Sequence, residues 1–284
     1  MMKRTLVVLT LAGTTIGVAA LGSAQAAQAP VVPVRGGTAC KTRPPVLLTA
    51  GRSPHAPLRF DLASMAGRSQ SLVAIETADL RTRAPGGTWR PSTTANTLVV
   101  VLKAGQPANG RLPMTTRMRA TGSSYPKPVK ATVKGYTDLL GGGRTAGGRD
   151  DDHFPRESVG VGATWRVVNC DEVAGTPARE TRTYTLRSVH DGTAQVTFRD
   201  VVSLDAAHLA LGSETIGGEV VTLRLMSLRG TATGSSAIQF AGGFSQTSQS
   251  VTRLHVSLVA RSPSTPKMVI RTEVVDTSSL LPSS

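Results

Sequence analysis

The chain has 284 residues, and its 32 Lys and Arg against 18 Asp and Glu give a formal net charge of +14. Its aromatic residues make up only 4% of the sequence. Proteins that bind single-stranded nucleic acids stack bases on exposed aromatic side chains, so we expect no nucleic-acid partner despite the basic charge. The same shortage argues against an aromatic platform for sugars.

The N-terminus has the order of features found in a cleavable signal peptide. Lys3 and Arg4 precede an apolar stretch from Leu6 to Leu21, and small residues follow at Ala24–Ala26. The stretch is shorter than the ~20 residues that a membrane span needs, which makes a permanent anchor the less favoured alternative. We therefore predict a signal peptide over 1–26, cleavage near Ala26, and a secreted, extracytoplasmic protein.

The two cysteines, Cys40 and Cys170, are an even number in a chain predicted to be exported. A disulfide between them is the default expectation in an oxidising compartment. The alternative is two buried thiols that act as small apolar residues. Because Cys40 lies well beyond the apolar stretch, we expect no lipid anchor.

The positive charge lies in the first half of the predicted mature chain. Residues 27–150 contain 18 Lys and Arg against 5 Asp and Glu, whereas residues 151–284 contain 12 against 13. Such a field attracts anionic membranes or wall polymers, and salt screens that attraction. The basic residues are scattered singly along the sequence, however, and an arginine-rich soluble surface explains them equally well.

Apolar and polar residues alternate with the period of two that is typical of strands with one solvated face. In one such stretch Met118 and Ala120 face one side, and Arg117 and Arg119 face the other. Asp191-Gly192 is a strong signal for a two-residue hairpin turn. The pattern indicates antiparallel strands at Thr97–Lys103, Leu112–Thr121, Thr183–Val189, Ala194–Leu204, Leu254–Ala260 and Met268–Val274.

These patterns predict an all-β protein of mainly antiparallel sheet, arranged as two sheets, a sandwich or a half-barrel, with at most one or two short helices. The one helix candidate lies near Asp205–Leu211 and ends at Gly212. Glycine-rich sequence separates two β-rich segments. The expected organisation is a Pro- and Ala-rich arm over 27–43, a basic first β unit over 44–140, a Gly-rich linker over 141–152 and a second β unit over 153–284.

A short segment, HFPRESVGVGATWR, resembles the signature F/L-P-x-x-x-V-G-x-G-x-x-W of a family of exported bacterial β proteins, many of them lipoproteins. The matching residues are Phe154, Pro155, Gly160, Gly162 and Trp165. The resemblance implies an envelope-associated β protein with no catalytic residues to carry over. The missing lipid-attachment cysteine departs from the many lipoproteins of that family.

No arrangement of residues in the sequence points to catalysis, a cofactor or a metal. The strings Ser124–Lys127 and Ser264–Lys267 match S-x-x-K, but proline before each lysine disfavours the helical turn that would place it beside the serine. The run Asp150–His153 contains consecutive acidic residues rather than the alternating ligands of a calcium loop. We therefore predict no catalytic, cofactor-binding or metal-binding residues.

The function predicted from the sequence is a non-catalytic binding or cell-envelope module. One form of this hypothesis is an apolar or lipid-like ligand held in a cavity, whose expected lining is Met114, Met118, Leu223, Leu225 and Leu258. A first alternative is adhesion to an anionic membrane or wall polymer through the basic half. A second is a hydrolase whose residues meet only in space.

Overall fold

The computed structural model describes residues 43–123, 125–140, 143–145, 154–173, 176–204, 209–216, 219–240, 246–264 and 267–283. The predicted signal peptide, Cys40 and the run Asp150–His153 lie outside these residues. Within the part of the chain that the structure describes, no helix is long and apolar enough to cross a membrane.

Long antiparallel strands dominate the described chain, which confirms the predicted fold class. The elements are β1 (Arg43–Thr49), β2 (Arg52–Ala56), α1 (Leu62–Met65), β3 (Ser69–Arg83), β4 (Arg90–Ala104), β5 (Arg111–Gly122), β6 (Tyr125–Asp138), β7 (Gly143–Thr145), β8 (Val159–Val161), β9 (Thr164–Val173), β10 (Thr176–His190), β11 (Thr193–Leu204), β12 (Leu209–Ile216), β13 (Glu219–Gln239), β14 (Gln246–Arg261) and β15 (Met268–Pro282).

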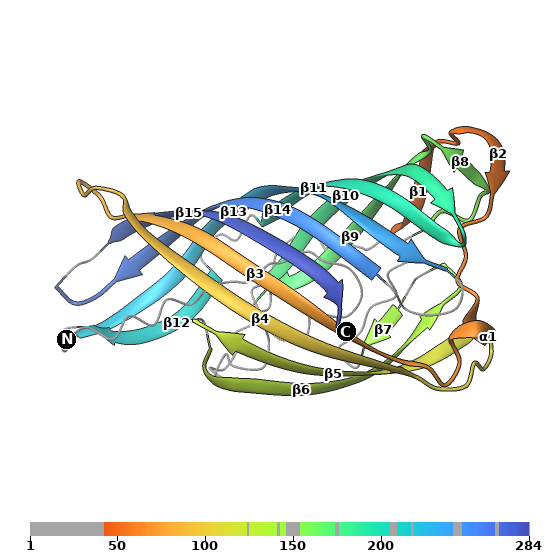
Figure 1. The fold of residues 1–284 in the computed structure, drawn as a ribbon. Coiled ribbons are helices and arrows are strands. Elements are labelled where there is room, and N and C mark those ends of the chain that lie inside the picture. The colour runs from red at the N-terminus through yellow and green to blue at the C-terminus, as the bar shows by residue number, and fades with distance from the viewer. Residues whose placement is uncertain are drawn as a thin grey trace.

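One large sheet contains strands from both halves of the chain. Its order is β1-β9-β10-β11-β13-β14-β15-β3-β4-β5-β6-β7, with β12 paired to β13, and β2 and β8 form a separate two-stranded sheet. The sheet is strongly curved, so that β5 and β6 lie below the other strands in Figure 1 and β9–β11 lie behind. The curvature gives the sheet an inner, buried face and an outer, exposed face.

The predicted hairpin turn is confirmed. Asp191 and Gly192 connect β10 to β11 and have φ angles of 48° and 70°. A type I′ turn requires positive φ at both central residues, which is why Asp-Gly is favoured there. The turn pairs His190 with Thr193, and a register shift between Leu186 and Ser188 then brings Tyr184 opposite Phe198 further along the two strands.

The prediction of a helix near Asp205–Leu211 is wrong over the described residues, which begin at Leu209. Leu209 begins β12, in which it lies opposite Leu225 of β13. The 21-residue strand β13 extends far enough to offer a backbone partner here, and ladder hydrogen bonds override a weak local helix preference. The described helix is instead the short α1, where Asp61 Oδ1 accepts hydrogen bonds from the backbone N–H groups of Ala63 and Ser64 at 3.1 and 3.2 Å.

The segment Leu58–Met65, which we call the plug, joins two distant parts of the sheet at one end. The Phe60 N–H donates to the Leu139 carbonyl just after β6 at 2.9 Å, and the Asp61 N–H donates to the Phe240 carbonyl just after β13 at 2.8 Å. Apolar side chains of the plug share a core cluster with residues from both halves. That cluster includes Leu58, Phe60, Leu62, Met65, Leu112, Phe154, Trp165, Tyr184, Leu186, Phe198, Ile238 and Phe240.

Candidate functional site

Phe154 and Trp165 of the short signature segment lie in the core around the plug. Trp165 is 0% exposed and stacks on Tyr184 with ring centroids 5.3 Å apart. Phe154 contacts Phe60 and Trp165 with centroids 5.8 and 6.3 Å apart. The segment therefore supplies packing surface that ties β9 to the plug.

Gly162 adopts a φ of +87° in the turn between β8 and β9. Residues with a side chain rarely adopt this left-handed conformation. Cys170 is 3% exposed on β9, but Cys40 is outside the described residues, so the disulfide stays a prediction.

The residues expected to line an apolar cavity do not come together in the described structure. Met118 belongs to a cluster on β3, β4 and β5, with Leu280 of β15. Leu225 and Leu258 belong to another, on β11, β13 and β14, and Met114 packs against the plug cluster as well as the Met118 cluster. The side chain of Leu223 is not described. The lipid-like ligand in that cavity therefore stays a prediction.

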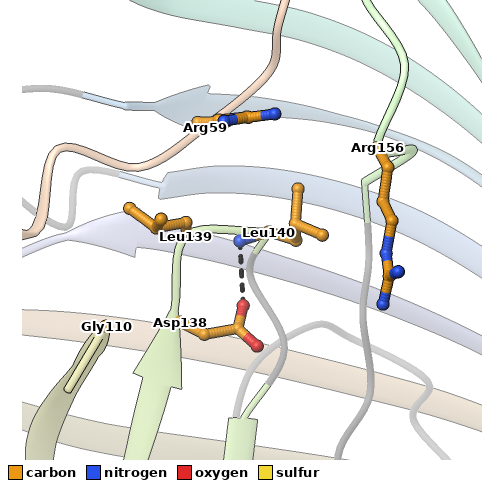
Figure 2. Close-up of a pocket in the computed structure, with 6 residues that line it drawn as sticks. All are labelled: Arg59, Gly110, Asp138, Leu139, Leu140 and Arg156. Atoms are coloured by element: carbon orange, nitrogen blue, oxygen red, sulfur yellow. Dashed lines mark hydrogen bonds between the residues drawn. The ribbon is translucent and has the colours of Figure 1, made fainter.

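A different pocket lies where the plug meets the end of β6. Its volume is about 330 Å³, and Figure 2 shows Arg59 and Arg156 on two separate segments beside Leu139 and Leu140. Asp138 accepts a hydrogen bond from the Leu140 N–H at 2.8 Å. This pocket combines two guanidinium groups with apolar side chains. Its lining residues are Arg59, Gly110, Asp138, Leu139, Leu140 and Arg156.

A concentration of positive charge on neighbouring strands lies on the outer face of β4–β6. We define the basic patch as Lys103 on β4, Arg117 and Arg119 on β5, and Lys130 and Lys134 on β6. All five side chains are exposed. Figure 1 shows β5 and β6 at the lower edge of the molecule, and β4 pairs with β5.

The strand register explains why these five residues form one patch. Arg119 lies directly opposite Lys130. Lys103 lies opposite Thr115, which in turn lies opposite Lys134. Opposite residues are ~5 Å apart, and successive residues on one face are ~6.8 Å apart along a strand. The five positive charges therefore fall within roughly 14 Å along the strands and roughly 10 Å across them.

Almost no negative charge balances the patch on its own strands. Asp138, at the end of β6, is the only acidic residue in the sequences of β4, β5 and β6. Like charges directly opposite each other destabilise a strand pair. The Arg119–Lys130 pair is therefore a local cost to the folded sheet, which an anionic partner would relieve.

The basic residues of this patch are visible in the sequence, but they lie singly along the chain and do not form a run. Arg117 and Arg119 alternate with apolar residues, as expected for a solvated strand face. What the sequence could not show is that β5 pairs with β6 in the register that places Lys130 opposite Arg119. That register places together residues that lie singly along the chain.

The inner face of the sheet carries two acidic side chains near each other, Glu76 on β3 and Asp276 on β15. Glu76 lies opposite Ser278, two residues from Asp276. Burial and, to a smaller extent, the nearby Asp276 carboxylate together raise the pKa of Glu76 from 4.5 to about 7. Burial also raises the pKa of Asp276 to about 6. Among the described residues, neither forms an ion pair.

A second buried charge cluster on the inner face is compensated. The Arg182 guanidinium donates two hydrogen bonds to Asp200, both at 2.6 Å, and one to Glu180 at 2.9 Å. Burial raises the pKa of Asp200, while its contact with Arg182 lowers it. The Arg182 side chain also lies over the Phe198 ring at 4.8 Å. This arrangement matches a structural ion pair in the core.

Within the described residues, no group of three or more His, Cys, Asp and Glu side chains is placed to hold a metal ion. Ser264 and Lys267 flank undescribed residues, and Ser124 and the run Asp150–His153 are themselves outside the described part.

No family model matches this chain, and no curated protein matches it. Among solved structures, it is similar to a Salmonella typhi OmpF complex with daunomycin at 6% identity and a TM-score of 0.25, covering 74% of this chain and 98% of that one. A mutant of the Rh. blastica porin aligns at 8% identity and a TM-score of 0.26, covering 76% and 100%. Pseudomonas aeruginosa OpdQ aligns at 7% identity and a TM-score of 0.25, covering 75% and 98%. Alignments with such TM-scores support no conclusion about this chain.

Proposed function

We propose that this chain is a non-catalytic extracytoplasmic protein that binds a linear anionic polymer of the cell envelope through the basic patch. The observation that supports this function most is the pairing of Arg119 with Lys130 on an exposed sheet face with one acidic residue in its three strands. The positive charge of residues 27–150 identified in the sequence is its origin.

The spacing of the charges favours a polymer with regularly repeated anionic groups. Charges on one face of a strand repeat every ~6.8 Å, and the Debye length at physiological ionic strength is ~8 Å. Neighbouring charges in the patch therefore act together on a bound chain. Arginine adds bidentate hydrogen bonds to phosphate or carboxylate groups.

A polymer fits the patch better than a lipid bilayer does. Binding to a bilayer gains strength from apolar side chains that enter the acyl region. The described large hydrophobic side chains that are most exposed all lie outside the patch, on other parts of the molecule. Val99 and Val101, which lie opposite Arg119 and Arg117, are only half-exposed.

A binding measurement with linear polyphosphate and polyglutamate tests this function. The variant Arg117→Gln/Arg119→Gln/Lys130→Gln removes three charges from the patch. The matched control Arg199→Gln/Arg253→Gln/Arg271→Gln removes three exposed charges from the other half of the sheet. We expect the patch variant to lose at least tenfold in affinity and the control to lose less than threefold. Equal losses of affinity in the two variants would mean that binding depends only on the net charge of the protein, and would contradict a defined site.

Vesicles of anionic lipid distinguish the polymer from a membrane surface. If the partner is a polymer, the protein binds polyphosphate at concentrations where it does not sediment with the vesicles. Sedimentation with vesicles that is stronger than binding to either polymer would contradict the polymer and favour a membrane partner.

A further inference from the structure

The pocket at the end of β6 is separate from the basic patch and shares none of its residues. It is formed by the plug, the turn that ends at Gly110, the end of β6 and the loop that contains Arg156. Its volume of about 330 Å³ falls at the lower end of the range typical of small-molecule sites.

Backbone hydrogen bonds fix the segments that carry the two arginines to the floor of the pocket. Phe60, next to Arg59, donates its N–H to the Leu139 carbonyl at 2.9 Å. Phe154, two residues before Arg156, donates its N–H to the Leu140 carbonyl at 3.1 Å. Both phenylalanines are also buried in the core. The two guanidinium groups therefore extend from anchored backbone rather than from free loops.

Positive charge predominates among the described lining residues of the pocket. Among the described residues, no ion pair is recorded for Arg59 or Arg156. Among the described lining residues the one acidic side chain is Asp138, and its Oδ1 accepts the Leu140 N–H. Two guanidinium groups on one small pocket offer the planar donor pairs that carboxylates and phosphates accept.

The pocket also presents apolar surface beside these charges. Leu139 is 41% exposed at the end of β6, and Leu140 also lines the pocket (Figure 2). A hydrocarbon group that covers Leu139 removes exposed apolar surface from water, which favours binding. A ligand that uses the whole pocket would join an anionic group to a short hydrocarbon part.

We propose that this pocket binds a small amphiphilic anion, with a carboxylate or phosphate held by Arg59 and Arg156 and a short hydrocarbon chain against Leu139 and Leu140. This site would act independently of polymer binding. A ligand with a single charged group engages it without needing the repeated charges of the basic patch.

Calorimetric titrations with octanoate, octyl phosphate, octanol and inorganic phosphate test the site. We expect the two amphiphilic anions to bind at least tenfold more tightly than octanol or inorganic phosphate. Arg59→Gln and Arg156→Gln should each weaken their binding at least fivefold. The exposed control Arg199→Gln should leave it unchanged.

Two results would overturn the site. The first is octanol binding as tightly as octanoate, which would mean that the guanidinium groups contribute nothing. The second is unchanged octanoate affinity in an Arg59→Gln/Arg156→Gln variant that retains the wild-type circular dichroism spectrum. The variant Leu139→Asn tests the apolar contact separately. It should weaken the binding of octyl phosphate and leave the binding of inorganic phosphate unchanged. The basic-patch variant should bind octanoate normally whether or not it binds polymers.

Discussion

Arg182 of β10 and Asp200 of β11 face each other directly across neighbouring strands, and two hydrogen bonds of 2.6 Å join the guanidinium to the carboxylate. Both side chains are almost completely buried, at 4% and 1% exposure. Removing Asp200 leaves the buried Arg182 charge only partly compensated, by Glu180, and breaking such a pair from one side costs more than the pair contributes when intact.

Replacing Asp200 alone should therefore destabilise the protein strongly. For Asp200→Ala we expect a loss of about 3–5 kcal/mol in the free energy of unfolding, measured by urea denaturation. The exposed Asp79, which accepts a hydrogen bond from Thr93 at 2.8 Å, provides the control. Its replacement by alanine should cost less than about 1.5 kcal/mol. A loss below 1 kcal/mol for Asp200→Ala would contradict a buried, ionised pair.

The inner-face carboxylate Glu76 should make stability depend on pH. Its folded pKa of about 7 lies above the ordinary 4.5, so the folded protein holds this proton more tightly than the unfolded chain does. The stabilisation is complete below pH 4.5 and is lost as pH rises through about 7. Glu76→Gln should therefore raise the free energy of unfolding by about 1–3 kcal/mol at pH 8 and change it little at pH 4.5.

Urea titrations of wild type, Glu76→Gln and the outer-face control Asp79→Asn at both pH values check this prediction. The effect of Glu76→Gln should grow with pH, and that of Asp79→Asn should not. A Glu76→Gln effect of the same size at pH 4.5 and pH 8 would mean that Glu76 has the same pKa in the folded and unfolded protein, and would contradict the prediction.

The strand pair β11–β13 should not tolerate a side chain at Gly234. A Cβ there would meet the Phe198 ring and the Gln249 backbone carbonyl. Overpacking of this kind costs about 1–3 kcal/mol. We expect Gly234→Ala to lower the midpoint of thermal unfolding by several degrees, whereas Gly87→Ala, whose Cβ would be at an ordinary 3.4 Å from the Ala84 carbonyl, should change it little. Equal midpoints would show that the sheet relaxes around the added methyl group.

Reversing one charge in the basic patch should change the stability of the protein and its affinity for polyphosphate in opposite directions. Arg119→Glu places a carboxylate directly opposite Lys130 and replaces a repulsive pair by an attractive one. Cross-strand pairs of this type contribute about 0.2–1 kcal/mol, so the variant should be slightly more stable than wild type. It should also bind polyphosphate more weakly. A variant that loses both stability and affinity would indicate that Arg119 has a structural role.

The strands were largely predictable because a two-residue period leaves a clear trace in the sequence. Arg117 and Arg119, for instance, were placed correctly on a solvated face, and Asp191-Gly192 on a hairpin turn. The order of strands was not predictable, because the pairing of β15 with β3 joins residues about 200 positions apart and no local pattern encodes it.

The candidate sites were also predictable only in part, because their residues are visible in the sequence but their assembly is not. The charges of the basic patch were visible in the sequence, but their assembly required the β5–β6 register. The pocket could not be predicted at all, since Arg59 and Arg156 lie far apart in the chain and line one pocket only because Phe60 and Phe154 bond to consecutive carbonyls after β6. The buried pair Arg182–Asp200 was missed because charged residues ordinarily mark the exposed face of a strand.

The most direct test of the central claim is the salt dependence of polyphosphate binding. If several patch charges replace counterions on the polymer together, the logarithm of the affinity falls linearly with the logarithm of the salt concentration, with a slope that grows with the number of contacts. We predict a steep slope for wild type and for Arg199→Gln/Arg253→Gln/Arg271→Gln. For Arg117→Gln/Arg119→Gln/Lys130→Gln we predict a slope smaller by about 2–3, and identical slopes for all three proteins would contradict the proposed site.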